Sequence, residues 1–153
     1  MSLISNSKAT FDYEILERYE AGVKLLGYEV KSLKAKHGDL QGSYVLIKSN
    51  ADGSRAAITL KNCLIPPYQE NNTPKDYDPR RDRELLLNMS EIAQLVKIEG
   101  TRGLTIIPIS MYNKGNTIKI ELAVARSKKK FDKRRSIEKR ETDRNIRREF
   151  KDR

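Results

Sequence analysis

The stretch that decides the fold class reads TIIPISMY at positions 105–112, NKGN at 113–116 and TIKIELAVAR at 117–126. Alternate positions of the last segment are aliphatic, with polar or small residues between them: the aliphatic ones are Ile118, Ile120, Leu122 and Val124. A period of two is typical of a strand that buries one face. Asn and Gly between two such segments favour a tight turn. The sequence therefore predicts a β-hairpin near the end of a mainly β domain.

Further strands are predicted upstream of this hairpin. From Tyr13 to Leu25 the odd positions are mostly apolar and the even ones mostly charged, and Gly22 is expected to be a bulge or bend in this strand. The apolar segments 43–47 and 55–60 flank NADG at 50–53, which predicts a second hairpin. Five or six strands are expected in all.

Two or three short helices are predicted between the strands. Val30 and Leu33 are spaced as on one face of a helix. Asp78-Pro79 is typical of a helix start, and Ser90 is expected to cap a further helix that closes at Gly100. These elements predict a mainly β fold, a closed barrel of about six strands of the oligonucleotide-binding (OB) type with two or three short helices.

The positive charge of the chain is concentrated at its end. Residues 126–153 contain 14 Lys/Arg and 6 Asp/Glu, whereas residues 1–125 contain 17 and 15. We therefore expect a near-neutral body of residues 1–125 and a basic tail of residues 126–153. The tail has few apolar residues, so it is expected to be disordered when free and helical once a partner neutralises its charge. Such a partner is anionic, either nucleic acid or a membrane surface.

Residues that carry chemistry are scarce. Cys63 and His37 are the only residues of their types, which leaves no intramolecular disulfide, no thiol-rich metal site and no compelling catalytic pair. Gly22 and Gly27 have the spacing of a phosphate-binding loop, but Tyr28 follows where that loop requires Lys. No segment approaches the roughly 20 apolar residues that span a bilayer. We therefore expect a cytoplasmic protein that is not an enzyme and has no cofactor or metal.

Several blocks of the sequence, in order, resemble the SmpB family, whose members bind transfer-messenger RNA in bacterial ribosome rescue. The blocks are YEAGVKLLGYEVKSLK at 19–34, GSYVLI at 42–47, DPRRDRELLLN at 78–88 and AVARSKKKFDKR at 123–134, followed by the basic tail. Each block alone is weak, but together they are specific and cover nearly all of the chain. The resemblance implies a closed barrel of the OB type, one face of which docks on the tRNA-like end of transfer-messenger RNA.

The resemblance also implies what the tail does. It would enter the empty mRNA channel of a stalled ribosome and become helical near the small-subunit decoding centre, mimicking codon–anticodon pairing. The expected function is thus delivery of transfer-messenger RNA to stalled ribosomes, which is trans-translation. The expected partners are this RNA and the ribosome, with no membrane partner, and the expected oligomeric state is a monomer.

Candidate site residues come from the matching blocks. The resemblance places four residues on the RNA-contacting surface: Glu20, Gly22, Leu86 and Asn88. Eight cations are expected phosphate contacts, although each alone could be ordinary surface charge: Lys31, Lys34, Arg80, Arg81, Arg83, Lys119, Lys128 and Lys129. The tail residues expected to contact the ribosome are Phe131, Asp132, Lys133, Arg134, Ile146 and Phe150.

Simpler interpretations of the same residues stay open. Glu20 could be an ordinary exposed strand residue, although its carboxylate could also accept from a base amino group or a ribose 2′-OH. Asn88 could simply end a helical turn before Ser90. Leu85 and Leu87, on either side of the predicted RNA contact in this block, are expected in the core.

Four positions depart from the family pattern. His is usual where this chain has Phe11 and Phe131, a cation is usual in place of Glu84, and Gly in place of Ser127. Phe131 matters most, because a His would stack or hydrogen-bond near the decoding centre, whereas Phe can only stack or pack.

Other functions also stay open. A generic single-stranded nucleic-acid-binding barrel is disfavoured by the absence of Trp and an aromatic content of 7%, because such proteins rely on stacking. A membrane-surface module is disfavoured because only Ile146 and Phe150 share a helix face cleanly in the tail. A solvated tail without a specific partner is the plainest alternative.

Overall fold

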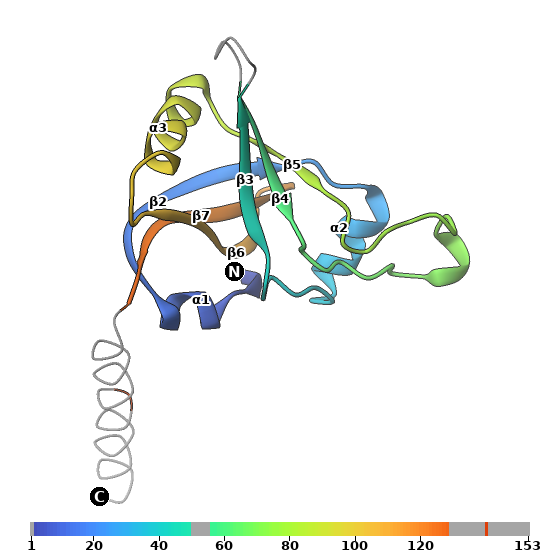
Figure 1. Ribbon diagram of the computed structural model, residues 1–153. Helices are drawn as coiled ribbons and strands as arrows, with labels where there is room; N and C mark the ends of the chain where they lie inside the picture. Colours follow the sequence, from blue (N-terminus) through green and yellow to red (C-terminus); the bar gives the residue numbers. More distant parts are fainter. Residues whose placement is uncertain (1, 50–55, 129–139, 141–153) are drawn as a thin grey trace, which may run out of the picture.

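The computed structural model of the chain describes residues 2–49, 56–128 and 140. Within that part the fold is mainly β, with three α-helices and one short 3-10 helix (Figure 1). None of the described helices is long and apolar enough to cross a membrane. In chain order the elements are β1 (Ser2–Ser5), α1 (Ser7–Asp12), β2 (Tyr13–Val23), α2 (Gly27–Lys34), β3 (Tyr44–Ser49), β4 (Ala56–Lys61), the 3-10 helix η1 (Glu70–Asn72), β5 (Arg83–Leu86), α3 (Met89–Glu99), β6 (Thr105–Lys114) and β7 (Thr117–Ser127).

The strands form one antiparallel sheet in the order β1-β6-β7-β2-β5-β4-β3. The sheet is strongly curved, so that β3 and β4 cross the direction of β2 and β7 (Figure 1). Its edge strands are β1 and β3, and no ladder joins them within the described residues. The barrel predicted from the sequence is therefore not closed by hydrogen bonds.

The predicted C-terminal hairpin is present as β6 and β7. The two strands pair from Thr105 opposite Ala125 to Lys114 opposite Thr117. The four aliphatic residues that alternate along β7 are each 7% exposed or less and lie in the main core. The long strand and the hairpin predicted upstream are also confirmed, as β2 and as β3 with β4, although the turn at 50–53 lies outside the described residues.

Helix α1, which the sequence analysis did not predict, covers the second face of β6 and β7. It contributes to a small separate core, made of Ala9, Ile107, Ile109, Ala123 and Ala125. The small side chains of the two β7 alanines leave room for the helix to pack closely on the strand. The segments 106–109 and 122–125 are consequently buried on both faces of the sheet.

The helix predicted to start at Asp78-Pro79 is wrong. A strand, β5, takes its place and pairs with β2 on one side and β4 on the other. Its side chains alternate between the two faces, with Arg83 and Leu85 buried and Glu84 and Leu86 exposed. The period of two was concealed in the sequence because one of the inward positions carries an arginine.

Two smaller differences concern the shape and length of strands. A bulge or bend was predicted at Gly22, and the bulge is wrong, because the irregularity in β2 lies between Ile15 and Glu17 and Gly22 pairs regularly on both sides. β7 continues to Ser127, two residues past the predicted boundary between body and tail.

Candidate nucleic-acid interface

The outward face of β2, β7 and β6 brings several of the predicted residues together. Gly22 of β2 pairs with Lys119 of β7, which pairs in turn with Tyr112 of β6. In a neighbouring row, Glu20 pairs with Glu121. Residues two apart on a strand share a face. The register of the sheet therefore sets Glu20, Gly22 and Lys119 on one surface.

The Glu20 carboxylate is held by two donors from β6. Its Oε1 accepts a hydrogen bond from Lys114 Nζ at 2.8 Å, and its Oε2 accepts one from the Tyr112 hydroxyl. The bonds from Lys114 and then from Tyr112 lower the pKa of the Glu20 carboxyl. Burial and the bond to Glu20 raise the pKa of Tyr112, so its hydroxyl stays protonated and donates. Glu20 is therefore an ionised and oriented acceptor at neutral pH.

Gly22 and Leu86 border a shallow cavity of about 280 Å³. The two residues are cross-strand neighbours on β2 and β5, and the Leu86 side chain is 47% exposed. Lys119 also lines the cavity, and its Nζ lies 3.7 Å from the point where a Cβ on Gly22 would be. Within the described residues Lys119 forms no ion pair. The surface thus combines an apolar side chain, a fixed carboxylate and an available cation.

Asn88 caps helix α3, where Ser90 had been predicted to do so. The Asn88 Oδ1 accepts hydrogen bonds from Glu91 N at 2.8 Å and from Ser90 Oγ at 2.7 Å. Its side chain is exposed, so this role in the cap does not compete with contact to RNA, which stays a prediction. The core positions predicted for its neighbours are confirmed, because Leu85 is 4% exposed and Leu87 packs against the main core.

The predicted phosphate contacts differ in their access to solvent. Lys31 and Lys34 on α2 are exposed, and so is Arg80, whose Nη1 lies 3.2 Å from Asn62 Oδ1. Arg83 is fully buried, and its Nε, Nη1 and Nη2 all donate hydrogen bonds to acceptors within the protein. The prediction of Arg83 as a phosphate contact is therefore wrong, because its donors are already used.

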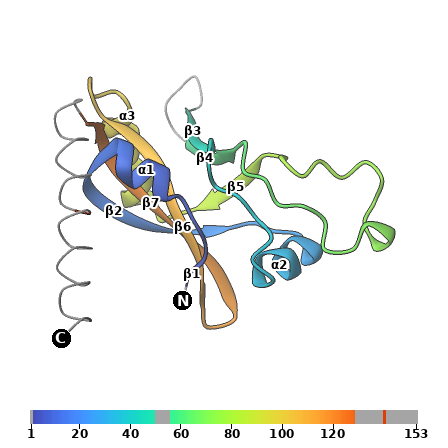
Figure 2. The ribbon, with the colours of Figure 1, turned by 90° about the horizontal axis from the view of Figure 1, so that it is seen from below.

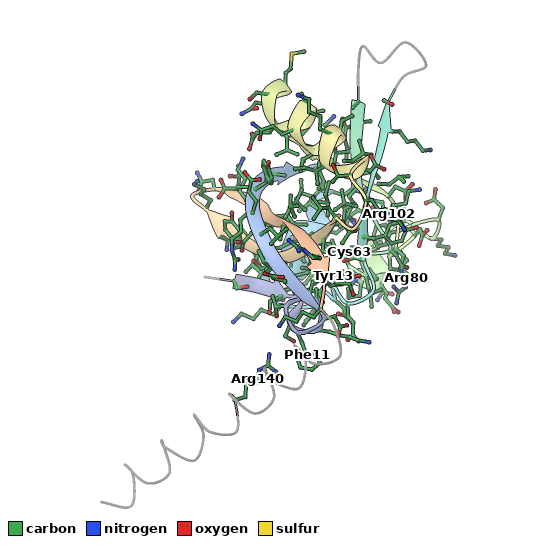
Figure 3. All side chains as sticks on the ribbon, turned by 60° about the vertical axis from the view of Figure 1, so that its left-hand side comes forward. Phe11, Tyr13, Cys63, Arg80, Arg102 and Arg140 are labelled. Atoms are coloured by element: carbon green, nitrogen blue, oxygen red, sulfur yellow. The ribbon has the colours of Figure 1, made fainter. Side chains whose placement is uncertain are left out.

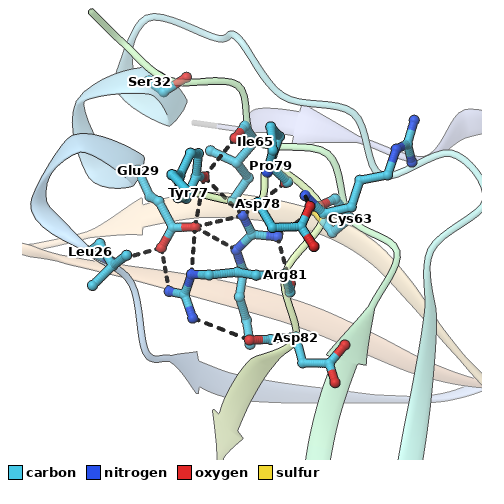
Figure 4. Close-up of polar contacts among 12 residues, drawn as sticks. Leu26, Glu29, Ser32, Cys63, Ile65, Tyr77, Asp78, Pro79, Arg81 and Asp82 are labelled. Carbon is cyan, nitrogen blue, oxygen red and sulfur yellow. Dashed lines mark hydrogen bonds and ion pairs between the residues drawn. The ribbon is translucent and has the colours of Figure 1, made fainter. Parts of the chain in front are cut away.

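Arg83 belongs to a buried polar cluster that joins α2 to β5. Figure 4 shows this cluster around Glu29, Tyr77 and Arg81. Arg83 Nε donates to Glu29 Oε2 at 2.8 Å, and Arg81 donates to both oxygens of the same carboxylate. Tyr77 Oη lies 3.0 Å from Glu29 Oε2 and 2.7 Å from the Ile65 carbonyl oxygen. Burial and the charge of Glu29 raise the pKa of Tyr77 to about 12.

This cluster determines where α2 lies. Seen from below, α2 and the loop that carries η1 stand together at one side of the sheet, far from α1 (Figure 2). Glu29 is on the inward side of α2, while the side chains of Lys31 and Lys34 are exposed. Helix α2 contributes Val30 to the lining of the cavity, and Lys31 and Lys34 are exposed on the same helix.

The start of the tail lies beside α1. The Lys128 backbone N–H donates to the Asp12 carbonyl oxygen at 2.9 Å. Arg140 Cζ lies over the ring of Phe11, 5.4 Å from its centre (Figure 3). One family departure, Phe11, is therefore in contact with a tail residue. The other predicted tail residues lie outside the described part of the chain: Lys129, Phe131, Asp132, Lys133, Arg134, Ile146 and Phe150.

Two further departures from the family pattern lie on strands β5 and β7. The carboxylate of Glu84 pairs with Lys24 Nζ at 2.9 Å, and both side chains are largely exposed. Ser127 pairs with Tyr13 at the end of β7.

No catalytic or metal site is found among the described residues. Cys63 is fully buried, as predicted, and burial raises the pKa of its thiol to about 11, which disfavours the thiolate. His37 is exposed. In the part of the chain that the structure describes, no three His, Cys, Asp or Glu side chains gather as metal ligands would.

Two residues of the surface, Tyr112 and Lys114, were missed from the sequence. Both occupy outward positions of β6, with the same parity along the strand. The sequence shows that Tyr112 and Lys114 are two positions apart and so share a face of their strand. It does not show which other strand lies next to that face. Only the register of β6 on β7 and of β7 on β2 shows that they reach Glu20.

Comparisons with known proteins agree with this geometry. The family model described as "SmpB protein" matches residues 3–152. An SsrA-binding protein of Mycoplasmoides gallisepticum is 43% identical over 145 residues, which cover 95% of this chain and 96% of that protein. An SsrA-binding protein of Halothermothrix orenii is 42% identical over 148 residues, covering 97% and 91%.

Among solved structures, a chain described as "tmRNA-SmpB: a journey to the center of the bacterial ribosome" superposes with a TM-score of 0.65. It is 39% identical in sequence, and the match covers 82% of this chain and 84% of that one. Family model, relatives and solved structure therefore lead to one conclusion: the chain belongs to the SmpB family.

Proposed function

We propose that this protein binds the tRNA-like domain of transfer-messenger RNA and delivers it to stalled ribosomes in the cytoplasm. One observation carries the proposal: Glu20, Gly22 and Leu86, drawn from two separate sequence blocks, meet on one exposed surface beside Lys119. The relatives named as SsrA-binding proteins and the solved tmRNA–SmpB chain support it. The role is one of binding, and a chain of this family is not an enzyme.

The surface has the chemistry that RNA binding needs. The exposed lysines on α2 and the half-buried Lys119 on β7 can neutralise phosphates. Each phosphate neutralised on a duplex steepens the log–log salt dependence by about 0.9. The exposed Leu86 offers an apolar contact to a base or sugar, and Glu20 offers an acceptor. Affinity would come from the cations, and discrimination from the leucine and the carboxylate.

The basic tail is proposed to act at a later step. It carries 14 of the 31 Lys/Arg residues of the chain and is proposed to become helical in the empty mRNA channel, mimicking codon–anticodon pairing near the decoding centre. A neutralising RNA wall would relieve the like-charge repulsion that opposes a helix in water.

The first test is binding of two chains to the tRNA-like fragment of transfer-messenger RNA. One is the full chain and the other ends at Lys128, because β7 runs to Ser127 and the Lys128 amide still bonds to α1. Affinity is measured at several salt concentrations with ordinary tRNA as competitor. We expect both chains to prefer the fragment, and the shorter chain to show a weaker salt dependence.

The same test separates the proposal from its main alternative. A generic single-stranded nucleic-acid-binding protein would show no preference for the fragment over tRNA or an unstructured RNA. Loss of all binding on removal of the tail would assign binding to charge alone and contradict the proposed interface.

A second test addresses the tail on the ribosome. Ribosomes stalled on a truncated mRNA are supplied with charged transfer-messenger RNA and either chain, and peptide tagging is measured. The chain ending at Lys128 is expected to bind the RNA but to support little tagging. Equal tagging by both chains would refute the tail's proposed role.

A further inference from the structure

The carboxylate of Glu20 is held by hydrogen bonds from side chains that lie two strands away in the sheet. Glu20 lies on β2, its two donors lie on β6, and β7 runs between them. The Tyr112 hydroxyl and Lys114 Nζ each bond a different carboxylate oxygen, the latter at 2.8 Å. Both donors must therefore reach across β7 to make these contacts.

A glutamate on an exposed strand is otherwise poorly suited to recognition. Its side chain has three rotatable bonds, and fixing them on binding costs free energy that is lost from affinity. Two charge-assisted bonds made before RNA arrives would remove most of that cost. A carboxylate has about four acceptor positions, so two bonds leave room for donors from a ligand.

Charge adds a second reason for this arrangement. An unpaired carboxylate would repel phosphates from the surface, and Lys114 compensates its charge. Glu121, the neighbouring acid on this face, has other partners. Its Oε1 forms an ion pair with Arg18 Nη1 at 2.5 Å, and its Oε2 accepts a hydrogen bond from Ser110 Oγ at 3.5 Å. The two acids thus have separate sets of donors.

We propose that Tyr112 and Lys114 are positioning residues that hold the Glu20 carboxylate ready to accept hydrogen bonds from RNA, from a base amino group or a ribose 2′-OH. This inference rests on the proposed function. Neither residue needs to touch the RNA for this role, because each acts through Glu20.

The test is a set of double-mutant cycles on binding to the tRNA-like fragment. Tyr112→Phe removes one hydroxyl and Lys114→Gln removes one cation, each in the native chain and in a Glu20→Ala chain. We expect Tyr112→Phe to weaken binding about threefold to tenfold in the native chain and to have almost no effect in the Glu20→Ala chain. Lys114→Gln is expected to show the same dependence on Glu20.

Matched controls come from the second acid on the same face. Ser110→Ala removes a hydroxyl that bonds Glu121, and Arg18→Gln removes the cation that pairs with it. Ser110 lies on β6 with Tyr112 and Lys114, whereas Arg18 lies on β2, and the two pairs of changes alter the net charge equally. The controls are expected to leave binding within about twofold. Thermal unfolding of all variants is expected to match the native chain, because none of these side chains is fully buried.

The outcomes separate this inference from the function on which it rests. If the native chain prefers the fragment but Tyr112→Phe binds as tightly as the native chain, the inference is wrong and the function stands. An equal loss in both backgrounds also overturns it, because a general effect on folding would not depend on Glu20. A native chain without preference for the fragment overturns the proposed function, and the inference with it.

Discussion

Glu29 on α2 and Arg83 on β5 form an ion pair in which both side chains are fully buried, with Arg83 Nη2 2.5 Å from Glu29 Oε2. Burying two charges is costly, and the cost is offset only where further hydrogen bonds satisfy them. Here Arg81 and Tyr77 supply such bonds to the carboxylate. No buried side-chain polar atom of the described residues is left without a partner.

Removing one partner of this pair is expected to destabilise the fold. Arg83→Met removes the fully buried cation of the pair and leaves Arg81 to compensate the Glu29 carboxylate, and a cost of about 3–5 kcal/mol in the free energy of unfolding is expected. Arg80→Met is the matched control, because the Arg80 side chain is exposed and, among the described residues, forms hydrogen bonds only to Asn62. It should cost less than about 1 kcal/mol. Urea denaturation of the three chains checks this, and equal stability of the two variants would contradict it.

The same pair gives a dependence of stability on pH. Burial alone would raise the pKa of the Glu29 carboxyl, but hydrogen bonds from Arg81 and Leu26 and the charge of Arg83 outweigh it and lower the pKa below its ordinary 4.5. A carboxyl whose pKa is lower in the folded state stabilises above the unfolded value, and this contribution is lost as pH falls through the folded value.

Glu29→Gln isolates that contribution. The variant is expected to be less stable than the native chain at pH 7. The difference should narrow as pH falls below about 4.5, because the unfolded native chain then binds a proton that Glu29 in the folded state takes up only at lower pH. Urea midpoints measured from pH 7 to pH 3 for both chains test this. A difference that stays constant over the range would show that Glu29 does not titrate with folding.

Local patterns sufficed to predict the strands whose two faces differ. Ile118 to Val124 along β7 alternate with polar or small residues, and their burial follows from that period. β5 could not be predicted in this way, because the inward side chain of Arg83 is polar and its partners, Glu29 and Cys63, come from distant parts of the chain. Its burial is a tertiary property that no local window contains.

The candidate site was only partly predictable for a related reason. Glu20, Gly22 and Leu86 were found through sequence blocks that resemble the family. Tyr112 and Lys114 have no such block, and their contact with Glu20 depends on register across a third strand. Pairings of this kind are set by the whole sheet rather than by the sequence near either residue.

Leu85 and Leu86 are expected to separate stability from RNA binding. Leu85→Ala empties a core position that is 4% exposed and should cost about 2–5 kcal/mol in the free energy of unfolding. Leu86→Ala removes a side chain that is 47% exposed, so it should cost less than about 1 kcal/mol and yet weaken binding to the tRNA-like fragment about fivefold or more. Urea denaturation and RNA titration of both variants check this, and an unchanged affinity in Leu86→Ala would remove that residue from the interface.

Gly22 is expected to matter for the shape of the interface rather than for the fold. A Cβ at this position would lie 3.3 Å from Leu86 Cβ and 3.7 Å from Lys119 Nζ. Because a Cβ is fixed to its backbone, Leu86 can relieve the first contact only by a small shift of β5 against β2. Gly22→Ala is therefore expected to weaken binding to the tRNA-like fragment about fivefold or more while changing stability by less than about 1 kcal/mol.

The matched control is Gly27→Ala at the start of α2, where a Cβ would meet no atom within 4 Å. An alanine favours a helix over a glycine, so this variant should be at least as stable as the native chain and bind RNA equally well. Both variants add one methyl group to a glycine, but only the one at Gly22 meets a neighbouring strand, which makes their difference a measure of the close approach between β2 and β5. If Gly22→Ala bound the fragment as tightly as Gly27→Ala, the RNA would not depend on that approach, and the interface would have to lie on another face of the sheet.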